Sequence, residues 1–280
     1  MRFRRNLLQL TTVVLMLEAT LYVFEIIKPG TYLVGMDKDD AWLIIGQLDL
    51  IIMQFHEANI ALNCFISASE WRDDGGNRAV VEEDMRRRPA IYEQVLREME
   101  DNPNVSSEDI DFEASARFEK ERWQRTGGPN AFKHMLPFIY AKTFLFALDG
   151  IDRFLELLSK DIAKGVPKEV ADWHGEFVRC FPQLREVRNS AHHSEDRSRG
   201  IRRGTKELDL KPIIDGPIHA PHGGALLMNC LNGSRYGATM ADGHYGEVDV
   251  SVESMRQLQR ILQGIFDSFA WTGRKQLRPF

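Results

Sequence analysis

Apolar residues recur at the spacing of an amphipathic helix in four long stretches of this 280-residue chain. The stretches cover about 37–71, from Pro129 to about Lys160, from Pro167 towards a pair of histidines, and from Ser254 to Trp271. Long helices joined by short connections pack most simply as an antiparallel bundle. The pattern therefore predicts a mainly α fold.

Individual residues mark the expected helix boundaries. Asp39 or Asp40 is suited to cap the first helix, and Ser254 with Gln257 has the spacing of a capping box for the last. Pro137 is expected to mark either the true start of the second helix or a kink, because proline removes a backbone donor and clashes with the preceding turn.

Residues 205–252 have a different pattern, in which turn signals at Asn232-Gly233 and Asp242-Gly243 separate short runs of strand-forming residues. They predict a two- or three-stranded antiparallel hairpin or meander, inserted before the last helix. We expect the strands of the protein to be confined to this insertion.

A charged segment at about 72–128 separates the first two bundle helices. Residues 70–128 contain 16 acidic and 10 basic residues, a net charge of −6, so the rest of the chain carries +1 of the total of −5. Two surface helices, at about 79–100 and 107–124, are expected here as an insertion. The arginines at 86–88 are expected on a solvated face, with phosphate contact as the alternative.

The N-terminal residues 1–35 are expected to form an apolar helix or an extension of the 36–280 domain. A basic start precedes an apolar run at 7–27, which resembles a signal peptide or anchor. However, Glu18 and Glu25 interrupt the run, so we expect a helix packed on the bundle and no stable membrane insertion. Translation from Met36 is a further alternative.

Composition narrows the class of protein. The chain is 43% hydrophobic and 28% charged, as in ordinary soluble domains, and its net charge of −5 argues against non-specific coating of nucleic acid. Cys64, Cys180 and Cys230 are widely spaced and odd in number, which disfavours a disulfide framework and predicts a cytoplasmic protein.

Residues 185–197 contain the side chains that are best suited to catalysis. This segment closes the third predicted helix and contains arginine, asparagine and the adjacent His192 and His193. Arginine supplies a permanent cation with a planar donor fork, and histidine exchanges a proton near neutral pH. These are the groups that phosphodiester chemistry needs when no metal takes part.

The spacing Arg188-Asn189-x-x-x-His193 resembles the Arg-x4-6-His motif of HEPN domains, and Arg185 with His192 fits the looser form. HEPN domains are helical bundles with this motif near the end of the third helix. The resemblance implies a metal-independent endoribonuclease without a cofactor, acting as a toxin or defence effector. It also implies RNA as substrate, a homodimer with a composite site, and in some relatives a nucleotidyltransferase antitoxin.

Carried over by position, Arg188 would hold the phosphate, Asn189 would orient it and His193 would transfer the proton. Residues four apart share a helix face, so His192 is the helical neighbour of Arg188, and His193 converges with Arg188 only if the helix ends there. His192 therefore stays a second catalytic candidate. The cations Arg185, Arg197 and Arg199 are candidates for substrate binding.

Two alternatives remain open for the same cluster. The first is a capped helix end, in which Glu195 and Asp196 pair with Arg185, Arg188 or Arg199 as surface salt bridges. The second is a non-catalytic helical module that binds nucleotide, RNA or a protein partner. No metal site is expected, because a metal needs at least three ligands in fixed geometry and His219-Ala-Pro-His222 has only Asp215 nearby.

Overall fold

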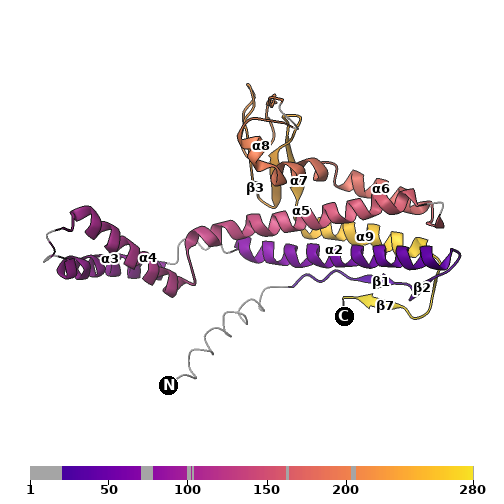
Figure 1. Ribbon diagram of the computed structural model, residues 1–280, viewed down its shortest axis with the longest axis horizontal. Coiled ribbons are helices and arrows are strands. Elements are labelled where there is room, and N and C mark those ends of the chain that lie inside the picture. The colour runs from indigo at the N-terminus through magenta and orange to yellow at the C-terminus, as the bar shows by residue number, and fades with distance from the viewer. Residues whose placement is uncertain are drawn as a thin grey trace, which may run out of the picture. The chain divides into compact units, whose positions relative to one another are not determined.

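The computed structural model describes residues 21–70, 78–99, 102, 104–161, 164–202 and 206–279 (Figure 1). It divides into two compact units, one formed by Met1–Ser67 with Phe138–Phe280 and the other by Ala68–Pro137. The described chain is mainly helical with small antiparallel sheets, which confirms the predicted fold class.

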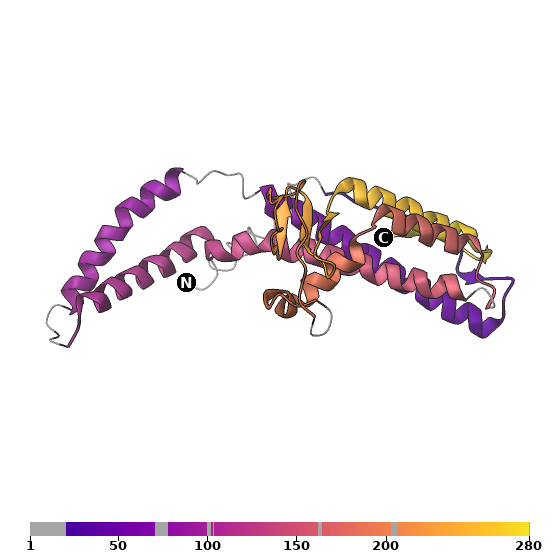
Figure 2. The ribbon, with the colours of Figure 1, turned by 90° about the horizontal axis from the view of Figure 1, so that it is seen from above.

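The first unit is built on three long helices, α2 (Lys38–Glu70), α5 (Asn130–Lys160) and α9 (Val252–Ser268), which run alongside one another in both views (Figures 1 and 2). Their apolar stripes face one shared core, where burying each large side chain contributes about 1.5–3 kcal/mol. α6 (Glu169–Cys180) packs on α9 where Gly264 leaves room for the ring of Trp173.

The third predicted helix is two helices, so that prediction was wrong. α6 ends at Cys180, and α7 (Leu184–His192) begins after a break at Phe181, whose backbone is not helical (φ −127°, ψ 59°). Pro182 explains the break, because the residue before a proline is disfavoured in helical conformation and proline itself has no N–H to donate. The short helix α8 (Ser194–Ser198) follows α7.

Three predicted boundaries are also corrected. Pro137 lies inside α5 and is therefore not its start; α5 starts at Asn130, next to the predicted Pro129, and a kink at Pro137 stays a prediction. Asp37 accepts a hydrogen bond from the N–H of Asp39 before α2, whereas Asp39 and Asp40 lie in its first turn. Ser251, not Ser254, caps α9 and accepts from the N–H of Ser254 at 3.2 Å.

The predicted meander is confirmed as β3 (Cys230–Asn232), β4 (Arg235–Thr239) and β5 (Tyr245–Asp249), and α7 contacts β4 and β5. Strands are not confined to this insertion, however. β1 (Ile26–Lys28) pairs with β7 (Gln276–Arg278), and β2 (Tyr32–Leu33) pairs with β6 (Trp271–Thr272), both antiparallel.

Most of the expected N-terminal helix, residues 7–20, lies outside the described residues. Its last part is not helical, since residues 21–25 have no regular structure and β1 follows. Side-chain amides of α2 replace the helical hydrogen bonds there: Asn63 Oδ1 accepts from the N–H of Tyr22 at 2.8 Å, and Asn59 Oδ1 accepts from the N–H of Phe24 at 3.3 Å. Among the described residues, no helix combines the length and apolar character that a membrane span requires.

The second unit is a helical hairpin of α3 (Arg78–Met99) and α4 (Ser107–Thr126), which confirms both helices predicted in the charged segment. A capping box between Ser106 and Asp109 starts α4, and Gly127 ends it in the left-handed conformation (φ 77°). The hairpin has a core of its own, made of Ile91, Val95, Ala114 and Phe118.

Candidate functional site

Two charged rows meet where α7 packs on α5. The Nη2 of Arg188 donates to both carboxylate oxygens of Asp149, each at 2.6 Å, and the two side chains are only 10% and 8% exposed. Asp149 also accepts from the Nε of Arg153 at 2.7 Å. The pair is buried, so removing one partner would leave a charge without water and with only partial compensation.

One turn back along α7, Arg185 donates to Asp152 at 2.6 Å and to Glu156 at 2.9 Å. The Nε2 of His174, from α6, lies 2.9 Å from the other oxygen of Asp152. Burial raises the pKa of Asp152, but hydrogen bonds from His174 and Arg185 outweigh burial and hold this pKa below its usual value. The carboxylate thus joins α5, α6 and α7 at one point.

The histidine pair lies at the end of α7. His193 terminates the helix (φ −106°, ψ 47°) while its N–H still donates to the carbonyl of Asn189 at 2.9 Å. The ring centroids of His192 and His193 are 4.9 Å apart with perpendicular planes, and His192 also meets the ring edge of Phe146 at 6.2 Å. Both imidazoles are exposed, and α7 ends at the histidine pair, which was the condition for His193 to converge with Arg188; the guanidinium of Arg188, however, is held by Asp149.

The predicted substrate-binding arginines separate into three situations. Arg197 is buried and points inward, where it donates to Ser190 Oγ at 3.3 Å and to the carbonyl of Ile201 at 2.8 Å. Arg199 is exposed and pairs with Asp196 at 2.7 Å. Arg185 is half-exposed but engaged by α5. Asn189, beside Arg188, is half-buried.

Sequence analysis missed the carboxylates Asp149, Asp152 and Glu156, as well as His174. Their signal is the spacing of acidic residues at i, i+3 and i+7 on α5, which matches two arginines three residues apart on α7. Of the salt bridges expected for a capped helix end, only that between Arg199 and Asp196 is present among the described residues.

His193, Glu195 and Asp196 form a cluster whose potential ligand atoms all lie within 4.8 Å of one another. An imidazole nitrogen and two carboxylates are a donor set that suits a divalent cation. Two of the three side chains are exposed, and Asp196 is already paired with Arg199. Because of this cluster, any activity of the protein should be measured both with and without divalent cations.

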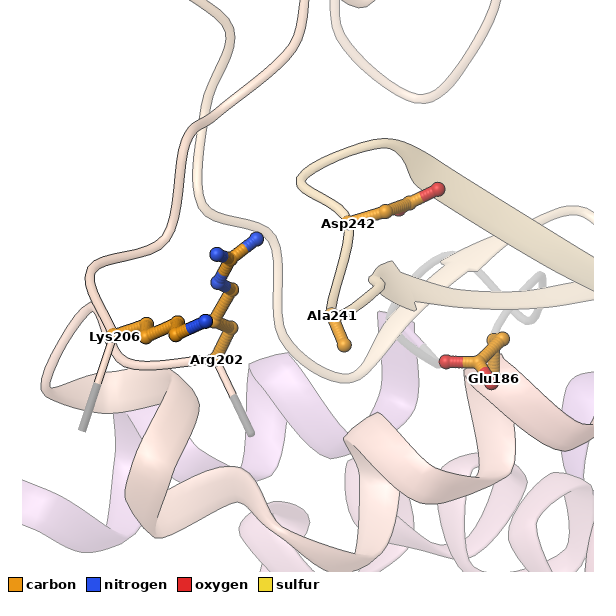
Figure 3. A pocket seen from close by; sticks show the side chains of 5 residues that line it. All are labelled: Glu186, Arg202, Lys206, Ala241 and Asp242. Carbon is orange, nitrogen blue, oxygen red and sulfur yellow. The ribbon is translucent and has the colours of Figure 1, made fainter. Parts of the chain in front are cut away.

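A pocket of about 490 Å³ lies next to α7, lined by Glu186, Arg202, Lys206, Ala241 and Asp242. Figure 3 shows Arg202 and Lys206 on one side and Glu186 and Asp242 on the other. Within the described part of the chain, neither Arg202 nor Lys206 takes part in a salt bridge. The pocket beside the first turn of α7 therefore holds two cations opposite the carboxylates of Glu186 and Asp242.

Comparison of the chain with sequence-family models, with curated proteins and with solved structures gives no match.

Proposed function

We propose that this protein is a metal-independent endoribonuclease of the HEPN type, with the histidine pair at the end of α7 as its proton-transfer groups. The observation that carries the proposal is the pairing itself: two exposed imidazoles 4.9 Å apart, on a helix end fixed by a buried ion pair. One fold element thus presents a base and an acid to the same phosphodiester.

The reaction needs only these groups and RNA. One imidazole takes the proton of the ribose 2′-hydroxyl as the 2′-oxygen bonds to phosphorus. The other, as imidazolium, gives a proton to the 5′-oxygen as its bond to phosphorus breaks. The products are a 2′,3′-cyclic phosphate and a 5′-hydroxyl. DNA lacks the attacking hydroxyl, which restricts the reaction to RNA.

We assign Arg188 a positioning role rather than the clamp role that the resemblance implies. Asp149 already occupies its Nη2, and its Nε is buried without a partner among the described residues, so a phosphate has no open approach. The exposed cations Arg202 and Lys206, which follow α7 in the chain, suit the phosphate contacts better.

The remaining parts of the proposal follow from the family resemblance. A homodimer would bring two histidine pairs to a composite site, and a nucleotidyltransferase antitoxin would silence a cytoplasmic toxin or defence effector.

The test is cleavage of a mixed-sequence RNA by the full chain in EDTA. We expect His193→Ala to lower the rate about 10²–10⁴-fold, the usual contribution of one acid–base group. The cleavage rate of His192→Ala shows whether His192 also transfers a proton. His244→Ala is the matched control, because His244 is an equally exposed histidine in the turn between β4 and β5. A substrate with a 2′-deoxy cleavage position should be inert.

The second candidate, a non-catalytic module that binds RNA, nucleotide or protein, is favoured by the engagement of Arg188 with Asp149. RNA binding without cleavage by the parent protein would select it. Activity that appears only with a divalent cation would instead assign His193 to the cluster with Glu195 and Asp196, and would contradict the metal-independent proposal.

A further inference from the structure

The hairpin of α3 and α4 leaves one apolar stripe of α3 exposed. Ile91 and Val95 face α4 and are buried, whereas Val81, Met85, Tyr92 and Leu96 are exposed, with Met85 at 72%. At 100° per residue these four side chains fall within an arc of about 60°. Scattered exposed apolar residues need no explanation, but an ordered stripe on a helix indicates a contact surface.

The stripe is symmetric about the middle of the helix. Val81 and Leu96 lie equally far from the midpoint between Arg88 and Pro89, and so do Met85 and Tyr92. A two-fold axis at this midpoint would place Val81 of one copy against Leu96 of the other, and Met85 against Tyr92. A self-complementary surface of this kind is what an isologous interface requires.

The centre of the stripe permits close approach. The guanidinium of Arg88 is turned towards its own hairpin, 4.9 Å from the ring centroid of Phe118. The compact ring of Pro89 is then the side chain nearest to the axis. Two helices can therefore come together without burying a cation between them.

Charge favours the antiparallel arrangement. α3 has five basic and five acidic residues, which cancel, whereas α4 has four basic and six acidic residues. Within α3, residues 78–88 carry four arginines and three acidic residues, a net +1, and residues 89–99 carry one arginine and two glutamates, a net −1. Antiparallel pairing brings the positive half onto the negative half, and parallel pairing brings like onto like.

From this geometry we propose that α3 binds α3 of a second copy of this chain, antiparallel, so that two hairpins form a four-helix bundle. The surface is separate from the histidine site, and the proposal does not depend on the RNA chemistry. Because the stripe extends only about 22 Å, it is smaller than a standard interface, and we expect a Kd on the order of 10 µM.

Sedimentation equilibrium of the full chain, at protein concentrations from 1 to about 200 µM, tests the association. We expect Met85→Glu to weaken self-association at least about tenfold, because a carboxylate would be buried against Tyr92 of the second copy. Phe112→Glu is the matched control, since Phe112 is an equally exposed aromatic residue on α4 outside the stripe. Circular dichroism checks that each variant keeps the helical content of the parent.

Cross-linking tests the direction of pairing. In a background where Cys64, Cys180 and Cys230 are alanine, a short bis-maleimide should join Met85→Cys to Tyr92→Cys when the two variants are mixed. Met85→Cys alone should remain uncross-linked, whereas a parallel pair would join it to itself.

Three results would overturn the proposal: a parent chain that is monomeric throughout, a dimer that Met85→Glu leaves intact, or cross-linking of Met85→Cys alone. The first result would also count against the composite dimer at the histidine pairs, whereas the other two do not bear on RNA cleavage. A dimer that persists in Met85→Glu with cleavage unchanged would reject the α3 interface and leave the ribonuclease proposal standing.

Discussion

The contact of α7 with α5 and that of α3 with α4 are both rich in ion pairs, yet the pairs differ in environment. Between α5 and α7, Arg188 and Asp149 are almost entirely withdrawn from water. Between α3 and α4, Arg87 with Glu121 and Arg117 with Glu98 keep a third or more of each side chain exposed. Separating the buried charges costs much free energy, because each would remain in the interior without its partner. The exposed charges lose little when they separate, because water replaces the partner.

The ion pairs of the two contacts therefore have different roles. In the hairpin, the ion pairs surround a small apolar core and add solubility and weak attraction. At the α7 contact, the charges replace apolar packing and fix one helix on another. A buried pair contributes less to net stability than its distance suggests, but it makes one arrangement far better than its alternatives.

Removing Arg188 should have the largest effect. We expect Arg188→Ala to lower the free energy of unfolding by about 3 kcal/mol, because Asp149 would keep only the exposed Arg153. Replacing both partners, as Arg188→Met with Asp149→Leu, should restore most of the loss. Urea unfolding of the singles and the double measures it. A double variant as unstable as Arg188→Ala would show that the pair is not the cause.

Asp152 should give a smaller effect that depends on pH. Its pKa is lowered in the folded state, so its contribution is present above its unfolded pKa of about 3.9 and is lost as the pH falls through the folded pKa. Asp152→Asn should therefore be less stable than the parent at pH 7, and the gap should narrow towards pH 3. Urea titrations at several pH values check this, and a gap that stays constant would contradict it.

In the described part of the hairpin, Asp84 is the least exposed of the acidic residues that form salt bridges. It is 2.7 Å from Arg125 and 3.0 Å from Arg122, with 18% of its side chain exposed. Asp84→Ala should cost about 1 kcal/mol or less. Hydrogen exchange of the α3 and α4 amides measures the stability of the hairpin directly. A loss of stability as large as that of Arg188→Ala would show that the ion pairs of the two contacts do not differ in their contribution.

The smallest effect is expected at Arg87, which pairs with Glu83 and Glu121 on an exposed face. Arg87→Ala should leave the thermal midpoint unchanged within error, with and without 0.5 M salt. A clear loss at low salt would show that the ion pairs of the hairpin act together as a network.

The sequence predicted those features that local pattern determines. The 33-residue helix α2 follows from a long run of periodic apolar residues, and the turn at Asn232-Gly233 follows from its residue types. Both hairpin helices were predicted as surface helices of the charged segment. The break before α7 was available in Pro182 but was outweighed by the surrounding helical pattern. Strands of two or three residues, such as β2 and β6, are too short to have a periodicity.

The candidate site was predicted only in part, because its partners are distant in sequence. Motif spacing located His192 and His193, and it identified the helix end as the condition for His193 to converge with Arg188. It also made Arg188 a free cation, because nothing local to α7 indicates that Asp149, 39 residues away, will occupy it. That pairing depends on how α7 is placed along α5, which is a property of the folded core.

The charged rows of α5 and α7 also determine where α7 lies along the axis of α5. Asp149 and Asp152 have the same spacing as Arg185 and Arg188, so a shift of α7 by three residues would place Arg188 opposite Asp152, while Arg185 would keep Glu156, which it already contacts. That shift would leave Asp149 in the interior with the exposed Arg153 as its single partner. A smaller shift would separate Arg188 from Asp149 without bringing it to Asp152, so the buried ion pair holds the histidines at one position along α5.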